Sequence, residues 1–127
     1  MTKGLVGTVL SRFEKAGLRI IALRVGRLTP AMCDVHYAHL KDKPFFGRIV
    51  EFMTSTPVIF GVLEGEGAVE RVRELCGPTD SKKAEKGTIR GDYGTDIQAN
   101  IVHASDSVET AEKEVRRFFK PEELVEY

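Results

Sequence analysis

The chain has 127 residues, 42% of them hydrophobic and 30% charged, and its 19 Lys and Arg balance 19 Asp and Glu to a formal net charge of zero. This length predicts one domain over residues 1–127, and the composition excludes a disordered, collagen-like or disulfide-rich protein. A zero net charge argues against partners held by bulk electrostatics, so we expect no nucleic acid and no membrane partner. Without a transmembrane stretch or an apolar signal region, the sequence predicts a soluble cytoplasmic protein with free, buried Cys33 and Cys76.

The first half of the chain predicts a helix, a strand and two further helices. Apolar residues near helical spacing predict a helix over 7–15, ended by a left-handed Gly17, and alternation over 18–28 predicts a half-buried strand. Thr29 can cap a helix over 30–39 that has Pro30 at its first position. A second short helix follows Lys43-Pro44, with an apolar stripe formed by Phe46, Ile49, Val50 and Met53.

The second half predicts a buried strand, a helix, a long loop and a final strand and helix. The apolar run 58–63 predicts a strand covered on both faces, followed by a helix over 68–75. Residues 77–100 lack sustained periodicity and predict a long functional loop. The run 101–104 predicts a short strand. Asp106 or Ser107 then caps a helix with Val108, Ala111 and Val115 on one face, and Asp106 and Glu109 have capping-box spacing.

The order of these elements defines the expected fold class. Strands separated by helices imply parallel crossovers in an α/β sandwich. The first helix has no strand before it, and three strands are few for four or five helices. We therefore expect either a small sheet or a strand missing before Gly4.

Three histidines are candidates for chemistry. His36 and His39 lie three apart on one helix face, but no cysteine or second carboxylate cluster completes a ligand set, so we predict no metal site there. His103 ends an apolar strand just before a helix N-terminus, where N–H groups and the helix dipole favour an anion. Taken alone, His103 is also compatible with a satisfied core histidine.

The long loop supplies groups that suit a polyphosphate. Arg73 precedes it, Thr79 and Arg90 lie within it, and flanking glycines allow close approach of phosphate oxygens to the backbone. Its lysines are interpreted mainly as a solvated surface; they are Lys82, Lys83 and Lys86. A histidine beside an anion-binding helix end and two arginines predicts a nucleophile for phosphoryl transfer.

Residues 100–107, which read NIVHASDS, closely resemble the active-site signature of nucleoside diphosphate kinases. The resemblance covers essentially the whole chain through further segments, namely Arg12-Phe13-Glu14, His36-Tyr37, Lys43-Pro44-Phe45-Phe46-Gly47, Gly87-Thr88-Ile89-Arg90-Gly91-Asp92 and Phe118-Phe119-Lys120-Pro121-Glu122-Glu123-Leu124. It implies a ferredoxin-like βαββαβ α+β sandwich with an antiparallel sheet. It also implies a Mg²⁺-dependent ping-pong reaction in which a phosphohistidine carries the γ-phosphate of ATP or another nucleoside triphosphate to a nucleoside diphosphate, in a homo-oligomer.

The resemblance also assigns roles to residues at matching positions. His103 resembles the phosphorylated nucleophile, and its neighbours resemble the orienting carboxylate and further polar contacts, which are Glu114, Ser105 and Tyr37. The nucleotide-binding positions are Arg73, Thr79 and Arg90 for phosphates, Asn100 for the ribose and Phe45 for base stacking. For Phe45 alone, core packing is the alternative. We expect Mg²⁺ to arrive with the nucleotide phosphates rather than on protein ligands.

The chain departs from the family pattern at its start. The family's first strand and its active-site lysine are absent, and the sequence opens at the following segment, residues 3–7. We therefore expect that the recorded start lies downstream of the true one, or that the chain was truncated. Smaller departures are Ala104 in place of the commoner glycine and Asp80-Ser81 in place of Asn-Pro. The alternative function is a catalytically impaired nucleotide-binding or assembly homologue that lacks the lysine.

Overall fold

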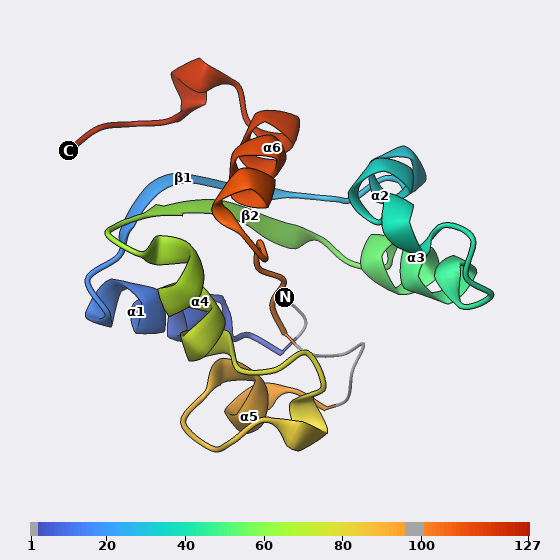
Figure 1. The fold of residues 1–127 in the computed structure, drawn as a ribbon, viewed down its shortest axis with the longest axis horizontal. Coiled ribbons are helices and arrows are strands. Elements are labelled where there is room, and N and C mark those ends of the chain that lie inside the picture. The colour runs from blue at the N-terminus through green and yellow to red at the C-terminus, as the bar shows by residue number, and fades with distance from the viewer. Residues whose placement is uncertain (1–2, 96–100) are drawn as a thin grey trace.

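The computed structural model describes residues 3–95 and 101–127, in which two long strands are surrounded by helices (Figure 1). The elements in chain order are α1 (Val6–Lys15), β1 (Arg19–Gly26), α2 (Pro30–His36), η1 (Ala38–Leu40), α3 (Phe46–Thr54), β2 (Val58–Glu64), α4 (Ala68–Cys76), η2 (Ser81–Lys83), α5 (Ile89–Tyr93), α6 (Val108–Phe118) and η3 (Pro121–Glu123). Helices α2 and α3 lie together at one end of the strands, and α1, α4 and α5 group near the other end (Figure 1).

Strands β1 and β2 are antiparallel, in a register that runs from Arg19 opposite Glu64 to Gly26 opposite Val58. The antiparallel sheet implied by the family resemblance is therefore confirmed, and the expectation of parallel crossovers is wrong for this pair. A parallel pair needs a connection that crosses one face of the sheet. Here α2 and α3 contact each other at the end of the strands, so the chain turns back beside β1.

Two predictions about strands are wrong. Strand β2 is half-buried along most of its length, with Gly61 and Glu64 exposed, rather than covered on both faces. Residues 101–104 form no strand, and Ile101 has a φ of 75°. Their apolar side chains are partly buried against the core instead, through Val102 and Ala104 among others. A segment that is buried without pairing to a strand has the same apolar sequence as a buried strand, so hydrophobicity alone does not distinguish the two structures.

Local signals at helix ends agree with the structure. Gly17 follows α1 with a φ of 86°. Thr29 caps α2, because its Oγ1 accepts a hydrogen bond from the amide N–H of Met32 at 3.2 Å. Helix α2 ends at His36 rather than continuing to residue 39, and a short 3₁₀ turn follows it. The loop 77–100 contains α5, which was not predicted because five residues are too few to show a helical period.

Helix α6 begins after the second of its two predicted caps. Ser107 is its cap, and the Ser107 hydroxyl accepts from the amide N–H of Thr110 at 3.1 Å. A capping box joins the cap residue to the third residue of the helix, which is Thr110 when Ser107 is the cap. The predicted capping box between Asp106 and Glu109 is therefore wrong, because it starts one residue too early. Val108 is 66% exposed and does not share the covered face.

Nine of the buried side chains in the described residues form two clusters. The α1–α5 cluster comprises Val9, Phe13, Leu18, Cys76 and Ile89, and the α2–α3 cluster comprises Leu28, Cys33, Tyr37 and Met53. Both cysteines are free and buried, one in each cluster. Within residues 3–95 and 101–127, no helix has the length and apolar character that a membrane crossing requires.

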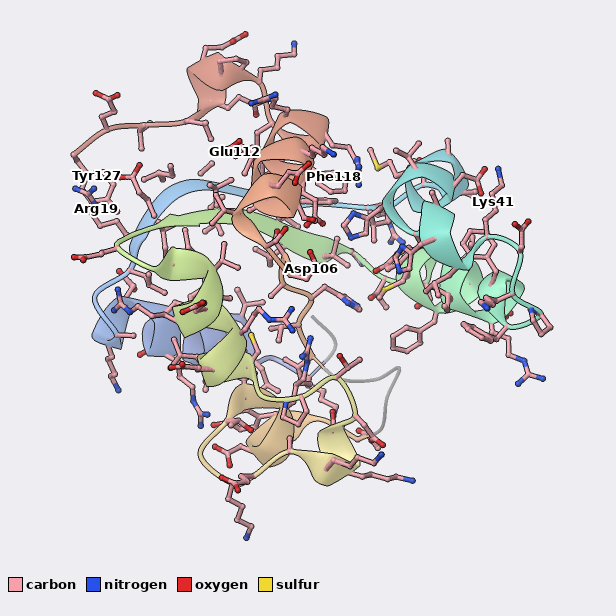
Figure 2. All side chains as sticks on the ribbon, in the orientation of Figure 1. Arg19, Lys41, Asp106, Glu112, Phe118 and Tyr127 are labelled. Atoms are coloured by element: carbon pink, nitrogen blue, oxygen red, sulfur yellow. The ribbon has the colours of Figure 1, made fainter. Side chains whose placement is uncertain are left out.

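The C-terminal residues lie along the edge of β1. The amide N–H of Val125 donates to the carbonyl of Ile21 at 3.0 Å, and the Tyr127 hydroxyl donates to the carbonyl of Ile20 at 2.8 Å. Arg19 donates to the backbone oxygen of Tyr127, and Figure 2 shows the two residues side by side. These contacts pair part of a strand edge that would otherwise expose unbonded backbone groups.

Candidate active site

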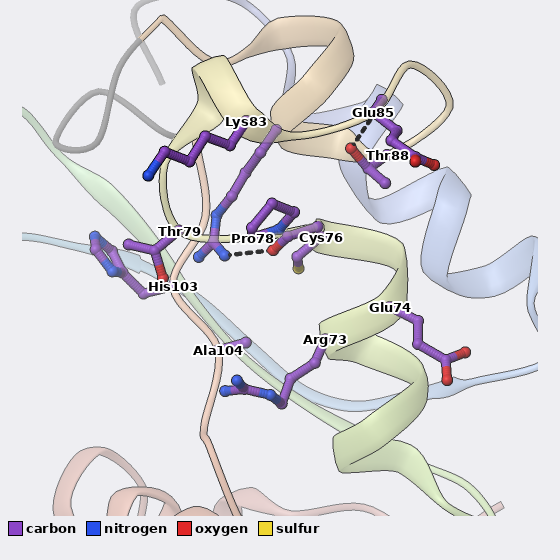
Figure 3. A pocket seen from close by; sticks show the side chains of 12 residues that line it. Arg73, Glu74, Cys76, Pro78, Thr79, Lys83, Glu85, Thr88, His103 and Ala104 are labelled. Atoms are coloured by element: carbon purple, nitrogen blue, oxygen red, sulfur yellow. Dashed lines mark hydrogen bonds between the residues drawn. The ribbon is translucent and has the colours of Figure 1, made fainter.

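A pocket of about 660 Å³ opens beside the C-terminal end of α4 (Figure 3). Its wall combines three segments that are distant in sequence, namely the end of α4, the loop before and into α5, and the segment that carries His103. The lining residues are Arg73, Glu74, Cys76, Gly77, Pro78, Thr79, Lys83, Glu85, Thr88, Arg90, His103 and Ala104. The structure therefore brings Arg73, Thr79, Arg90 and His103 together, four of the residues singled out in the sequence.

Gly77 shapes the pocket where α4 ends. Its φ of 83° is left-handed, and a Cβ at this position would lie 2.8 Å from the Thr88 hydroxyl. Only glycine combines this conformation with so close an approach. The resulting turn directs the next residues, including Thr79, along the pocket wall.

Arg90 ties two walls of the pocket together. Its guanidinium is buried and donates to the carbonyl of Gly77 at 2.8 Å and to the carbonyl of Val102 at 2.7 Å. Gly77 is the residue that caps the C-terminal end of α4, and Val102 immediately precedes His103. The Arg90 Nε is buried and has no hydrogen-bond partner among the described residues. A buried donor without a partner costs free energy.

Helix α5 is held in place by α1 and by close backbone packing. Arg12 of α1 donates to the Asp92 carboxylate at 2.5 Å and to the Gly87 carbonyl at 3.1 Å. The Gly87 amide and Arg12 together lower the pKa of Asp92, so the carboxylate stays ionised. A Cβ on Gly91 would lie 1.9 Å from the Glu85 carbonyl oxygen, so the chain can fold this tightly only with glycine there.

His103 presents a neutral imidazole to the pocket. His103 is exposed to water and also lines the pocket wall. Desolvation of the ring by the protein atoms around it, with the positive charge of Arg90 and a smaller effect of His36, lowers the pKa of His103 to about 4. The side chain is therefore uncharged at neutral pH, and a ring nitrogen keeps its lone pair.

Tyr37 and His36 lie behind His103. The Tyr37 ring is buried and meets the His103 ring edge-on, with 6.0 Å between centroids, and burial raises the pKa of Tyr37 to about 12. Glu114 lies nearer to His36, with 3.3 Å between its Oε2 and the His36 Nδ1, and no hydrogen bond joins it to His103 within the described chain. Its other oxygen, Oε1, is buried without a partner in the same residues. The structure thus groups Glu114, His36, Tyr37 and His103, and His36 contacts both the carboxylate and the Tyr37 ring, with 4.7 Å between the ring centroids.

The remaining predicted site residues lie outside the pocket wall or outside the described residues. Phe45 lies at the start of α3 and is 45% exposed, which excludes core packing as its role. Ser105 is half-buried two residues after His103 and does not line the pocket. Asn100, the predicted ribose contact, lies outside the described residues.

The pocket suits phosphate oxygens better than a protein-bound metal ion. In the parts of the chain that the structure describes, no group of three or more His, Cys, Asp or Glu residues is placed to hold a metal. Arg73 and Arg90 instead supply donors for anionic oxygens. The buried Cys76 thiol also lines the pocket, and burial raises its pKa, which disfavours the reactive thiolate.

Sequence reasoning missed two features of this site. His36 was interpreted as part of an amphipathic helix, but it contacts Glu114. Lys83 was interpreted as solvated surface, but it lines the pocket. No signal in the sequence distinguishes Lys83 from its neighbour Lys82, because the direction of each side chain depends on how the 3₁₀ turn η2 sits against the rest of the chain.

Comparison with known proteins identifies the family. The model of the nucleoside diphosphate kinase family matches residues 1–124. The chain is 47% identical to the nucleoside diphosphate kinase of Pyrococcus horikoshii over 130 residues, covering 100% of this chain and 83% of that protein. It is 51% identical to the enzyme of Parabacteroides distasonis, covering 98% and 82%.

Solved structures agree with this similarity. The nucleoside diphosphate kinase of Aquifex aeolicus superposes with a TM-score of 0.93 at 46% identity, covering 98% of this chain and 91% of that one. The enzyme of Halobacterium salinarum in complex with CDP gives 0.96 at 41% identity, covering 99% and 84%. These values confirm the ferredoxin-like fold that the sequence implied, and with the match of the family model over nearly the whole length they establish that the chain belongs to the nucleoside diphosphate kinase family.

Proposed function

We propose that the chain is a nucleoside diphosphate kinase in which His103 carries the transferred phosphoryl group. The observation that carries this proposal is a neutral His103 in a pocket whose other side chains include Arg73 and Arg90. A nucleophile and cations that face one cavity are the groups that phosphoryl transfer requires.

The reaction proceeds in two balanced half-reactions. A ring nitrogen of His103 forms a bond to the γ-phosphorus of a nucleoside triphosphate, while the bond from that phosphorus to the bridging oxygen breaks and the nucleoside diphosphate leaves with the electron pair. In the second half-reaction, a terminal phosphate oxygen of another nucleoside diphosphate attacks the same phosphorus, and the nitrogen–phosphorus bond breaks to regenerate the neutral imidazole.

The pKa values support His103 over Cys76 as the nucleophile. Both side chains line the pocket. Burial keeps the imidazole in its unprotonated, nucleophilic form, whereas it keeps the thiol protonated and unreactive. The same physical effect therefore favours one group and disfavours the other.

Positive charge in the pocket would offset the charge of the transferred group. The remaining N–H groups on the terminal nitrogens of Arg90 and the exposed guanidinium of Arg73 can donate to oxygens on the α-, β- or γ-phosphates. Mg²⁺ would enter as part of the nucleotide substrate, bound to its phosphates. Tyr37, through its edge contact, would hold the His103 ring, and Glu114 and Ser105 would assist in orienting it.

Nucleotide recognition would depend little on the base. Exposed Phe45 offers an aromatic face to any base, and Asn100 would contact the ribose. The Halobacterium salinarum relative binds CDP, a pyrimidine nucleotide. Purine and pyrimidine diphosphates should therefore both accept phosphate from this chain, and a preference above about a thousandfold for one base would contradict stacking as the main base contact.

Incubation with γ-labelled ATP tests the proposal directly. We expect label on the protein that acid treatment removes, because a phosphohistidine is acid-labile, and we expect His103→Ala to abolish it. The matched control is Cys76→Ala, which should retain labelling because it removes the other nucleophile of the pocket. Absence of label on folded protein would favour an inactive nucleotide-binding homologue; the enzymes at 47% and 51% identity support the active one.

The family relationship also supports a cytoplasmic homo-oligomer. Light scattering coupled to size-exclusion chromatography would measure the mass of the particle, and a mass equal to one chain of 14.1 kDa would overturn this part of the proposal. Fractionation of the source cells would test the compartment.

A further inference from the structure

The pocket contains a cation that the sequence did not predict. Lys83 lines it together with Thr79 and His103. In Figure 3 the amino group of Lys83 points toward the end of the pocket where these two residues lie. Lys83 forms no hydrogen bond or ion pair through its side chain with any residue in the ranges 3–95 and 101–127. Its ammonium is therefore free to meet a ligand.

The backbone beneath Lys83 is fixed. The Asp80 carboxylate accepts from the amide N–H of Lys82 at 3.1 Å, and the Asp80 carbonyl accepts from the amide N–H of Lys83 at 2.9 Å. Ser81 is buried, and Gly94 packs so closely on it that a Cβ there would lie 2.0 Å from the Ser81 hydroxyl. A turn held from both sides sets the direction in which the Lys83 side chain leaves it.

The charges of the pocket are separated. Arg73 extends toward the side of Ala104 and His103, whereas Glu74 points away on the opposite side of α4 (Figure 3). Glu85 lies at the far end beside Thr88, whose hydroxyl donates to the Glu85 carbonyl at 2.6 Å. The cations thus gather around His103 while the carboxylates lie away from it, which favours an anion at the histidine end.

Arg90 by itself offers this anion limited contact. Each of its two terminal nitrogens already donates to a backbone carbonyl, at 2.8 and 2.7 Å. Two of the five guanidinium N–H donors therefore stay committed to the backbone, and each terminal nitrogen keeps one N–H for a phosphate oxygen. A nucleoside diphosphate brings several negative charges, so further cations beside Arg90 strengthen its binding.

We propose that Lys83 is a third phosphate-binding cation of this pocket, which contacts the phosphate chain of the nucleotide beside His103. The inference rests on the proposed function for the identity of the ligand, and it assigns Lys83 to the phosphates rather than to the base or sugar. An ammonium on a flexible stem acts as a point charge, so it can follow the phosphate chain as the leaving and entering nucleotides alternate.

Lys82 provides a matched control, because it lies on the same turn and has the same charge but does not line the pocket. We expect Lys83→Ala to weaken binding of ADP about fivefold in calorimetry at low salt, and Lys82→Ala to change it less than about twofold. The charge reversals Lys83→Glu and Lys82→Glu alter net charge equally. A larger loss of affinity for ADP in Lys83→Glu than in Lys82→Glu would therefore result from the position of Lys83 and not from the overall charge.

Two further readouts separate a phosphate contact from a structural role. Lys83→Arg should retain most of the affinity for ADP, and the loss in Lys83→Ala should shrink as salt concentration rises. In the steady state, Lys83→Ala should raise KM for ATP and for the acceptor more than it lowers kcat. Circular dichroism would check that each variant is folded.

Equal effects at the two lysines, or a Lys83→Arg variant as weak as Lys83→Ala, would overturn this inference. Its failure is distinguishable from failure of the proposed function. If the parent chain transfers phosphate and Lys83→Ala binds ADP as well as the parent does, only the role of Lys83 is wrong. If the parent binds ADP but is never labelled by ATP, the proposed function is wrong and the affinity series still decides the role of Lys83. A parent that does not bind ADP overturns both.

Discussion

The protonation of His103 offers a quantitative test of how the pocket tunes its nucleophile. Burial and Arg90 lower the pKa of His103 to about 4. At pH 5, a histidine with this pKa is about 90% neutral, whereas one with the ordinary value near 6.5 is only about 3% neutral. The pocket therefore makes roughly a 30-fold difference in the nucleophilic form at this pH.

Nuclear magnetic resonance measures this protonation without nucleotide, whose phosphates titrate in the same range. We expect the His103 ring signals to titrate with a midpoint near pH 4, and the His103→Gln variant to assign them among the three histidines. Circular dichroism would confirm that the chain stays folded over the titration. A midpoint above about 5.5 would refute the reasoning, because the ring would then not be shielded by the pocket.

The same shift affects stability. Because the folded pKa lies below the unfolded one, the unfolded chain binds more protons between pH 6.5 and about 4, and the free energy of unfolding falls as pH drops through this window. The full shift corresponds to roughly 3 kcal/mol, which screening at a solvent-accessible ring reduces to about 1 kcal/mol. Urea titrations should show this extra loss in the parent and not in His103→Gln.

Three further substitutions, one of them with a matched control, test the packing of α5, the base contact and the cap of α6. Gly91→Ala places a Cβ 1.9 Å from the Glu85 carbonyl oxygen and should lower the free energy of unfolding, measured by urea titration, by at least about 2 kcal/mol. The control Gly47→Ala has nothing within 4 Å of its added Cβ and should be neutral or stabilising. Equal effects of the two substitutions would contradict the packing of α5. Phe45→Ala should weaken ADP and CDP alike by about 1–3 kcal/mol in calorimetry, because stacking tolerates any base, and a loss for only one base would contradict this role. Ser107→Ala removes the cap of α6 and should cost about 1 kcal/mol in thermal unfolding, and an unchanged midpoint would show that the cap contributes little.

Local chemistry explains which elements the sequence predicted. Thr29 and Gly17 mark helix ends through bonds and dihedral angles that involve only nearby residues, so the sequence contains the relevant information. Helix α5 has a local cap, because the Thr88 hydroxyl accepts from the amide N–H of Gly91 at 3.0 Å, but no helical period follows the cap, and the segment 101–104 has no local signal. The first is too short to show a period, and the second is apolar because tertiary packing covers it rather than because a strand pairs with it.

The candidate site divides in the same way. The resemblance selected Arg73, Thr79, Arg90 and His103, which the structure places around one pocket. The contact of Glu114 with His36 and the direction of the Lys83 side chain were not predicted. Both features depend on how separate elements are oriented toward each other. A sequence motif identifies the residues of a site but does not show which neighbour each side chain contacts.

The two core clusters have a consequence for how nucleotides exchange. Tyr37 belongs to the α2–α3 cluster, and Phe45 begins α3. Arg90 follows directly on Ile89, which belongs to the α1–α5 cluster. The groups proposed for the base and for the phosphates therefore rest on two different core clusters, which meet where the Tyr37 ring packs edge-on against His103. Hydrogen exchange should resolve two levels of protection, and transient loosening of the α2–α3 cluster would release the base of a spent nucleotide while the phosphate-binding residues stay folded for the next half-reaction.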